Sequence, residues 1–81
     1  MSQRHYLTVN KRALIRRINR RLVPQDQQLW TNRSRQWHSS LGDYYVTDIN
    51  HNVLVETHID LEELGRRVGA LSALEEVAEA A

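Results

Sequence analysis

The stretch YYVTDINHNVLVETHI, residues 44–59, holds two short runs of β-favouring side chains on either side of a polar triplet. Tyrosine, valine and threonine dominate the two runs, as is typical of strands that pack one face on a core. The triplet, Asn50 to Asn52, tolerates the left-handed backbone that a tight turn needs. The stretch therefore predicts an antiparallel hairpin with strands at 44–48 and 53–59.

Upstream of the hairpin, residues 11–23 predict a helix. Apolar side chains recur there every three or four positions, which places them along one helical face. Asn10 or Thr8 is positioned to cap the start, and Pro24 ends the helix because it lacks an amide N–H. The apolar stripe consists of Leu14, Ile15, Ile18 and Leu22.

Downstream of the hairpin, Asp60 followed three residues later by Glu63 has the form of a capping box. This signal predicts a second helix, and Gly69 marks its end. Ser72 and Glu75 repeat the same spacing, so a short final helix is also predicted.

A further strand is predicted within residues 29–39, with 40–43 as the turn that leads into the hairpin. The resulting fold class is α+β, in the order helix, three-stranded antiparallel sheet, helix. We expect one small domain over residues 1–81, with fraying at 1–8 and 78–81. The predicted core consists of Leu14, Ile18, Leu22, Val46, Val55, Leu61, Leu64 and Val68.

Composition excludes several kinds of protein. The 81 residues include no cysteine, so disulfides, thiolate metal sites and thiol nucleophiles are ruled out. No apolar run is long enough to span a membrane, which predicts a soluble, cytoplasmic protein. The four histidines follow no metal-binding spacing, and no catalytic motif is present. We therefore expect a non-enzymatic protein without a metal or another cofactor.

Charge is divided unevenly along the chain. Residues 1–37 contain nine lysines and arginines and one aspartate, a formal charge of +8, whereas residues 38–81 contain two arginines and nine acids, a charge of −7. Clustered guanidinium groups attract phosphates, although the same groups can neutralise the acidic half within the fold or across a homodimer. Both interpretations stay open from sequence. The arginines of the first helix form two rows at i, i+4 spacing: Arg12, Arg16 and Arg20, and beside them Arg17 and Arg21.

Trp30 and Trp37 alternate with Arg33 and Arg35 in the segment that follows. This mixture suits the stacking of unpaired bases, with the arginines on the backbone phosphates. Burial in the core is the commoner role for tryptophan, and it is the interpretation that we favour in a chain without phenylalanine.

Two segments, RALIRRINRRL (12–22) and SRQWHSSLGDYYVTDINHNVLVETHIDLEELGRRVG (34–69), resemble short uncharacterised proteins encoded on proteobacterial plasmids and integrative elements. The resemblance implies a mobile-element setting and carries no activity over to particular residues. It leaves two hypotheses. The first is a nucleic-acid-associated accessory or regulatory protein that uses the basic first helix. The second is a protein-binding inhibitor or assembly factor, for example one directed against a host defence complex, that docks on an acidic protein surface.

The predicted order of elements is also similar to that of double-stranded RNA-binding domains, which pack two helices on a three-stranded antiparallel sheet. Those domains open their second helix with lysines, whereas this helix opens with Asp60, Leu61, Glu62 and Glu63, which would repel phosphate. The resemblance therefore extends to topology and not to RNA-binding residues. The hairpin also resembles that of ribosome- or gyrase-directed bacterial toxins, but Tyr45 stands where those have arginine.

Overall fold

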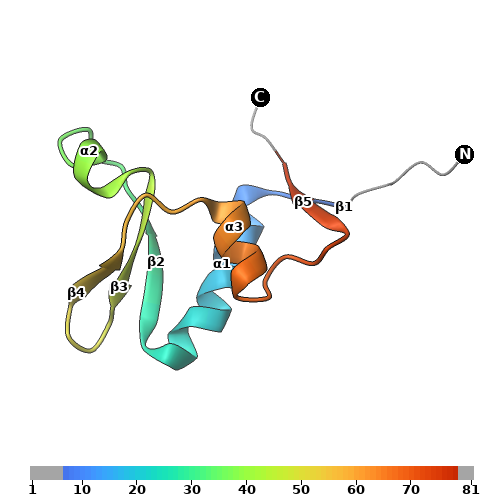
Figure 1. Ribbon diagram of the computed structural model, residues 1–81, viewed down its shortest axis with the longest axis horizontal. Coiled ribbons are helices and arrows are strands. Elements are labelled where there is room, and N and C mark those ends of the chain that lie inside the picture. Colours follow the sequence, from blue (N-terminus) through green and yellow to red (C-terminus); the bar gives the residue numbers. More distant parts are fainter. Residues whose placement is uncertain (1–6, 79–81) are drawn as a thin grey trace, which may run out of the picture.

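In the computed structural model, which describes residues 7–78, one main helix packs against a three-stranded antiparallel sheet (Figure 1). The α+β class and this sheet are confirmed. The predicted order of helix, three strands and helix is not confirmed, because a short helix interrupts the strands and two further strands lie outside the sheet. The elements in chain order are β1 (Leu7–Val9), α1 (Lys11–Leu22), a 3₁₀ turn (Val23–Gln25), β2 (Gln27–Thr31), α2 (His38–Leu41), β3 (Tyr44–Asp48), β4 (Val53–Glu56), α3 (Leu61–Arg67) and β5 (Glu75–Val77).

The sheet has the order β2-β3-β4, and the predicted hairpin is its second half. Its turn is held by Asp48, whose Oδ1 accepts a hydrogen bond of 2.9 Å from the backbone N–H of His51. This bond is the main cause that holds the pKa of Asp48 below its ordinary value. β4 ends at Glu56 rather than at Ile59. His58 has a φ of 52°, which interrupts the extended backbone before the N–H of Ile59 donates to the carbonyl oxygen of Tyr44 at 3.1 Å.

The first strand of the sheet differs from its prediction. β2 begins at Gln27, two residues earlier than expected, and ends at Thr31. Asn32 closes the loop beyond it by donating from Nδ2 to the carbonyl of Gly42 at 2.8 Å. The last residues of the expected strand instead start α2. Gly42 is required after α2, because its φ is 74° and a Cβ there would lie 2.8 Å from the Cα of His58.

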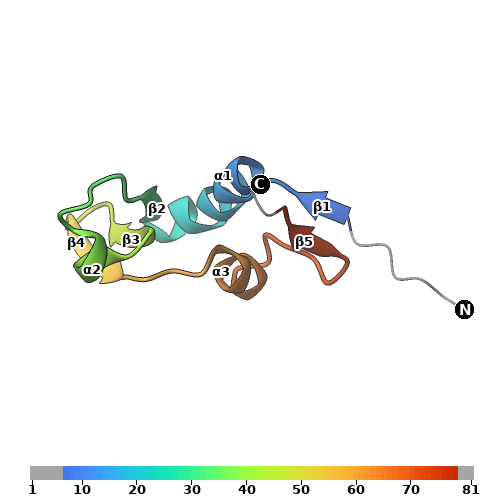
Figure 2. The same ribbon diagram turned by 90° about the horizontal axis from the view of Figure 1, so that it is seen from above.

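Helices α1 and α3 lie next to each other beside the sheet (Figure 2). Asn10 caps α1, since its Oδ1 accepts from the N–H of Ala13 at 2.8 Å, and Asp60 caps α3 in the same way. The helices approach closely at Gly65, where an added Cβ would lie 3.0 Å from the side chain of Leu14. Both predicted caps of the two main helices are confirmed.

The core lies between α1, α3 and one face of the sheet. Six of the eight predicted core residues are buried, and Val68 is partly buried. The prediction for Val55 is wrong, because this side chain is 47% exposed. A β-bulge between Val46 and Thr47 shifts the register of β4, so alternation no longer assigns its faces. The buried residues that were not predicted are Val9, Leu29, Ile59, Ala70 and Leu71.

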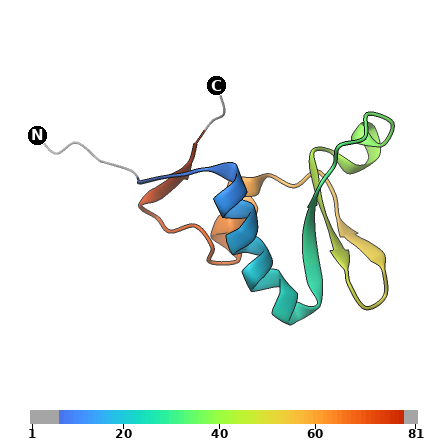
Figure 3. The ribbon, with the colours of Figure 1, turned by 180° about the vertical axis from the view of Figure 1, so that it is seen from behind.

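A second, two-stranded sheet forms at the far end of the molecule from β4 (Figures 1 and 3). Here β1 pairs in parallel with β5, and Leu7 lies opposite Glu75. The predicted final helix is therefore wrong: residues 75–77 gain a strand partner, whereas a helix of one turn has too few hydrogen bonds to be stable. Of the residues expected to fray, 1–6 and 79–81 lie outside the described residues, and Leu7 and Thr8 belong to β1.

Candidate nucleic-acid interface

The five arginines of α1 surround a helix whose remaining face is in the core. Leu14, Ile18 and Leu22 are buried at three- and four-residue spacing, which fixes the rotation of the helix. The row at Arg12, Arg16 and Arg20 is exposed. We call these three residues the outer row. Arg17 and Arg21, which we call the inner row, lie on the flank that faces the segment after α3.

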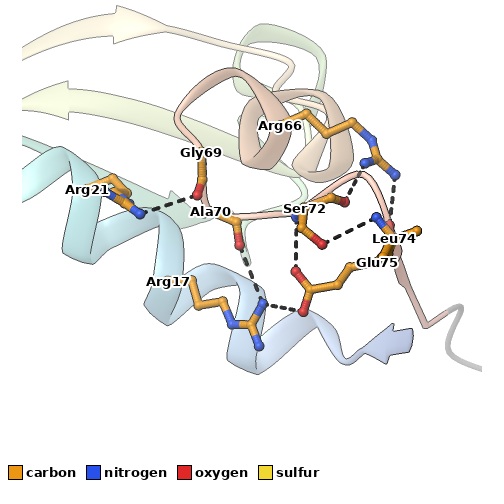
Figure 4. A network of polar contacts seen from close by, with 8 residues as sticks. All are labelled: Arg17, Arg21, Arg66, Gly69, Ala70, Ser72, Leu74 and Glu75. Carbon is orange, nitrogen blue, oxygen red and sulfur yellow. Dashed lines mark hydrogen bonds and ion pairs between the residues drawn. The ribbon is translucent and has the colours of Figure 1, made fainter. Parts of the chain in front are cut away.

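The inner row is used to hold the fold together. Nη1 of Arg17 lies 2.8 Å from Oε2 of Glu75, and it also lies 3.5 Å from the carbonyl oxygen of Ala70 (Figure 4). The carboxylate of Glu75 is 14% exposed, against 41% for the side chain of Arg17. The hydrogen bond from Arg17 is the main reason that the pKa of Glu75 lies below its ordinary value. The positive charge of Arg17 is therefore neutralised by Glu75 within the fold.

The same carboxylate belongs to a wider set of hydrogen bonds shown in Figure 4. Oε1 of Glu75 accepts from the N–H of Ser72 at 2.9 Å. On the other side, Arg66 of α3 donates to the carbonyl oxygens of Ser72 and Glu75, at 2.8 and 2.9 Å. Two arginines from two helices thus fix the segment that leads into β5, and with it the second sheet.

Arg21 makes one long contact, 3.5 Å from Nη2 to the carbonyl oxygen of Gly69. Together with Arg17 and Arg20 it lines a hollow of about 270 Å³, whose other wall is Gly69 and Ala70. Gly69 leaves this space open, since it carries no side chain and an added Cβ would meet nothing within 4 Å. The hollow is a concave site at which guanidinium groups from both rows meet.

The outer row has a different environment. Among residues 7–78, no carboxylate lies within 4 Å of Arg12, Arg16 or Arg20. These three side chains are exposed to solvent. An exposed guanidinium can donate hydrogen bonds to a phosphate or to a carboxylate of another molecule. Neutralisation within the fold therefore accounts for Arg17 and, among residues 7–78, does not account for the outer row.

The tryptophans are not in the core. Trp30 is 43% exposed on β2 and Trp37 is 53% exposed at the start of α2, so our prediction of buried indoles is wrong. The indole N–H of Trp30 finds its partner on the sheet, where Oγ1 of Thr47 accepts it at 2.9 Å. The exposed Arg33 and Arg35 lie in the loop between β2 and α2. Figures 1 and 2 show α2 and the loop before it at the end of the sheet away from α1, whereas Trp30 belongs to β2, the strand next to α1.

A larger hollow of about 680 Å³, which was not predicted, lies between β3, the start of α3 and the chain after β5. Its lining includes the acidic residues Asp43, Asp60, Glu62 and Glu63, the basic residues Lys11 and Arg66, and apolar residues such as Ile59 and Leu61. Across residues 7–78, no three histidine or acidic side chains are arranged to hold a metal ion. Polar walls of this kind suit solvent and not an apolar ligand.

The chain has no match among protein-family models, curated proteins or solved structures. The resemblance to mobile-element proteins stays a prediction. Over residues 7–78, no helix combines the length and the apolar character that crossing a membrane requires.

Proposed function

We propose that this protein is a non-catalytic, cytoplasmic, nucleic-acid-associated accessory or regulatory protein that binds the sugar-phosphate backbone through the outer row. The observation that supports the proposal is the difference between the two rows. Arg17 is committed to Glu75, whereas Arg12, Arg16 and Arg20 have no acidic partner within 4 Å among residues 7–78.

The geometry of the row suits a chain of phosphates. Residues four apart on a helix are separated by about 6 Å along the axis, so three guanidinium groups follow one another at a spacing that a nucleic-acid backbone can match. Each can donate two parallel hydrogen bonds to one phosphate. Such contacts carry no sequence information, so the proposed binding is directed to the backbone and not to base edges.

Arg33, Arg35, Trp30 and Trp37 make up a second part of the proposed interface, for single strands. Exposed indoles stack on bases of any sequence, and the two arginines follow β2 within a few residues of Trp30. The loop and α2 lie away from α1, so Arg33, Arg35 and Trp37 lengthen the proposed interface and do not enlarge the patch on α1 (Figure 1).

The test is the salt dependence of binding to duplex and single-stranded oligonucleotides. Three phosphates neutralised on duplex DNA give a slope of about −2.7 in log K against log salt. The triple variant Arg12→Gln, Arg16→Gln, Arg20→Gln should lose this binding and keep the circular dichroism spectrum of the wild type. Absence of wild-type binding to either oligonucleotide at about 50 mM salt would exclude the proposal.

A protein-binding inhibitor or assembly factor is the second candidate. The exposed tryptophans favour it, since tryptophan and arginine are enriched where proteins meet. In that case the outer row contacts an acidic protein surface. A protein that ignores nucleic acid at low salt but captures one acidic partner from the native host, through the same three arginines, would establish this function instead.

A further inference from the structure

Strand β4 exposes its side chains in a way that an ordinary edge strand does not. A strand with one face on a core buries every second side chain. In β4, the consecutive residues Val53, Leu54 and Val55 are 52%, 50% and 47% exposed. Among residues 7–78, β3 is the only strand that pairs with β4, and α3 reaches it at Glu56 through Arg67.

Among residues 7–78, no strand pairs with the outer side of β4. β4 is the last strand in the order β2-β3-β4, so part of its N–H and C=O groups point away from the sheet. The opposite edge of the sheet, β2, is bonded by a side chain of α1. There, the side-chain amide of Asn19 binds the backbone of Leu29 twice, with N–H to Oδ1 at 2.7 Å and Nδ2 to O at 3.3 Å. One edge of the sheet is thus closed by a side chain, while the other is open and apolar.

Proteins commonly protect an exposed edge with lysine, proline or an unpaired charge. β4 has none of the three, and its protection is limited to its short length and the adjacent β-bulge. Its one charged residue, Glu56, is held by Arg67, whose Nη2 lies 3.0 and 3.1 Å from the two carboxylate oxygens. The edge therefore presents apolar side chains and backbone groups that are free to form hydrogen bonds. A partner strand can use both, whereas a charged ligand cannot.

We propose that β4 pairs antiparallel with β4 of a second copy of this chain, which joins two three-stranded sheets into one six-stranded sheet. An antiparallel pair of identical strands is self-complementary about a two-fold axis. With Leu54 opposite Leu54 at the two-fold axis, the contact is between apolar side chains, and Glu56, the one charged residue of β4, lies off the axis. The net charge of +1 per chain adds little repulsion between the copies.

This inference is independent of the proposed function, and its test uses no nucleic acid. The wild-type chain should sediment as a monomer–dimer equilibrium whose dimer fraction rises between about 1 and 500 μM, the range in which small interfaces associate. Leu54→Lys should sediment as a monomer throughout, because it places a charge at the two-fold axis. Its melting temperature at low concentration should equal that of the wild type, since Leu54 is half exposed.

Val23→Lys is the matched control. Val23 is 51% exposed and lies in the 3₁₀ turn after α1, away from β4, so this variant should dimerise like the wild type. A wild-type chain that is monomeric at about 500 μM would overturn the proposal. So would a dimer that survives Leu54→Lys or that is lost equally in Val23→Lys.

Discussion

The outer and inner rows of α1 contain the same residue type on the same helix, yet they have different surroundings. Arg17 and Arg21 face the 69–75 segment and bind its carboxylate and carbonyl oxygens, whereas Arg12, Arg16 and Arg20 face solvent. The difference arises from helix rotation, which the buried face of Leu14, Ile18 and Leu22 determines. The basic helix thus has two different flanks: one stabilises the fold, and the other has no acidic partner among residues 7–78.

The largest expected effect comes from removing the residue that sets this rotation. Ile18 is completely buried on the core face of α1. Ile18→Ala should lower the free energy of unfolding by about 2–5 kcal/mol, because it leaves a cavity in a small core. Urea denaturation measures this loss. A change below about 1 kcal/mol would mean that α1 is rotated differently and that the assignment of the two rows is wrong.

Asn19 lies on the flank of α1 opposite the inner row and connects the helix to the edge of β2. Asn19→Ala leaves the backbone N–H and C=O of Leu29 without their partners, so the free energy of unfolding should fall by about 1–3 kcal/mol. The hydrogen exchange rate of the Leu29 amide should rise more than that of the amides on β3. Equal exchange in variant and wild type would show that Asn19 does not close this edge.

Arg17→Gln and Arg16→Gln make the same chemical change on the two rows. Arg17→Gln removes the contacts to Glu75 and Ala70 and should lower the melting temperature by a few degrees. Arg16→Gln should leave it within about 2 °C of the wild type, as for most surface substitutions. Thermal denaturation at neutral pH measures both. Equal effects would remove the distinction between the rows.

The Arg17 contact also predicts a dependence on pH. Glu75 has a folded-state pKa below its ordinary value of 4.5, so it binds protons more readily when unfolded. Its contribution to stability is present above pH 4.5 and is lost as the pH falls through the lowered pKa. The difference in melting temperature between wild type and Arg17→Gln should therefore shrink below pH 4.5. A difference that stays constant down to about pH 2 would contradict this assignment.

Local features were predictable because neighbours in sequence determine them. The caps at Asn10 and Asp60, the apolar face of α1 and the turn of the hairpin all depend on residues within four positions of each other. The outer row followed from the same helical spacing. What the sequence did not give is the division between the rows, since Arg17 and Glu75 are 58 positions apart.

The errors have similar causes. β5 depends on a strand at the other end of the chain, so no local pattern distinguishes it from the short helix that Ser72 and Glu75 suggested. The hydrogen bond between those two residues does form, but without a helix around it. Val55 is exposed because a bulge alters the alternation of β4. Trp30 is exposed because it lies on the face of β2 opposite the buried Leu29.

The most direct test of the account compares two charge-matched double variants of α1 for duplex DNA binding at about 50 mM salt, where backbone contacts are strongest. Arg12→Gln with Arg16→Gln and Arg17→Gln with Arg21→Gln each remove two positive charges from the same helix. Fluorescence anisotropy, at a temperature where both variants are folded, should show that the first pair weakens binding at least tenfold and lowers the salt slope by about 1.8. The second pair should retain most of the wild-type affinity and slope. Equal losses in the two variants, or a larger loss in the second, would contradict the claim that the outer row is the binding surface.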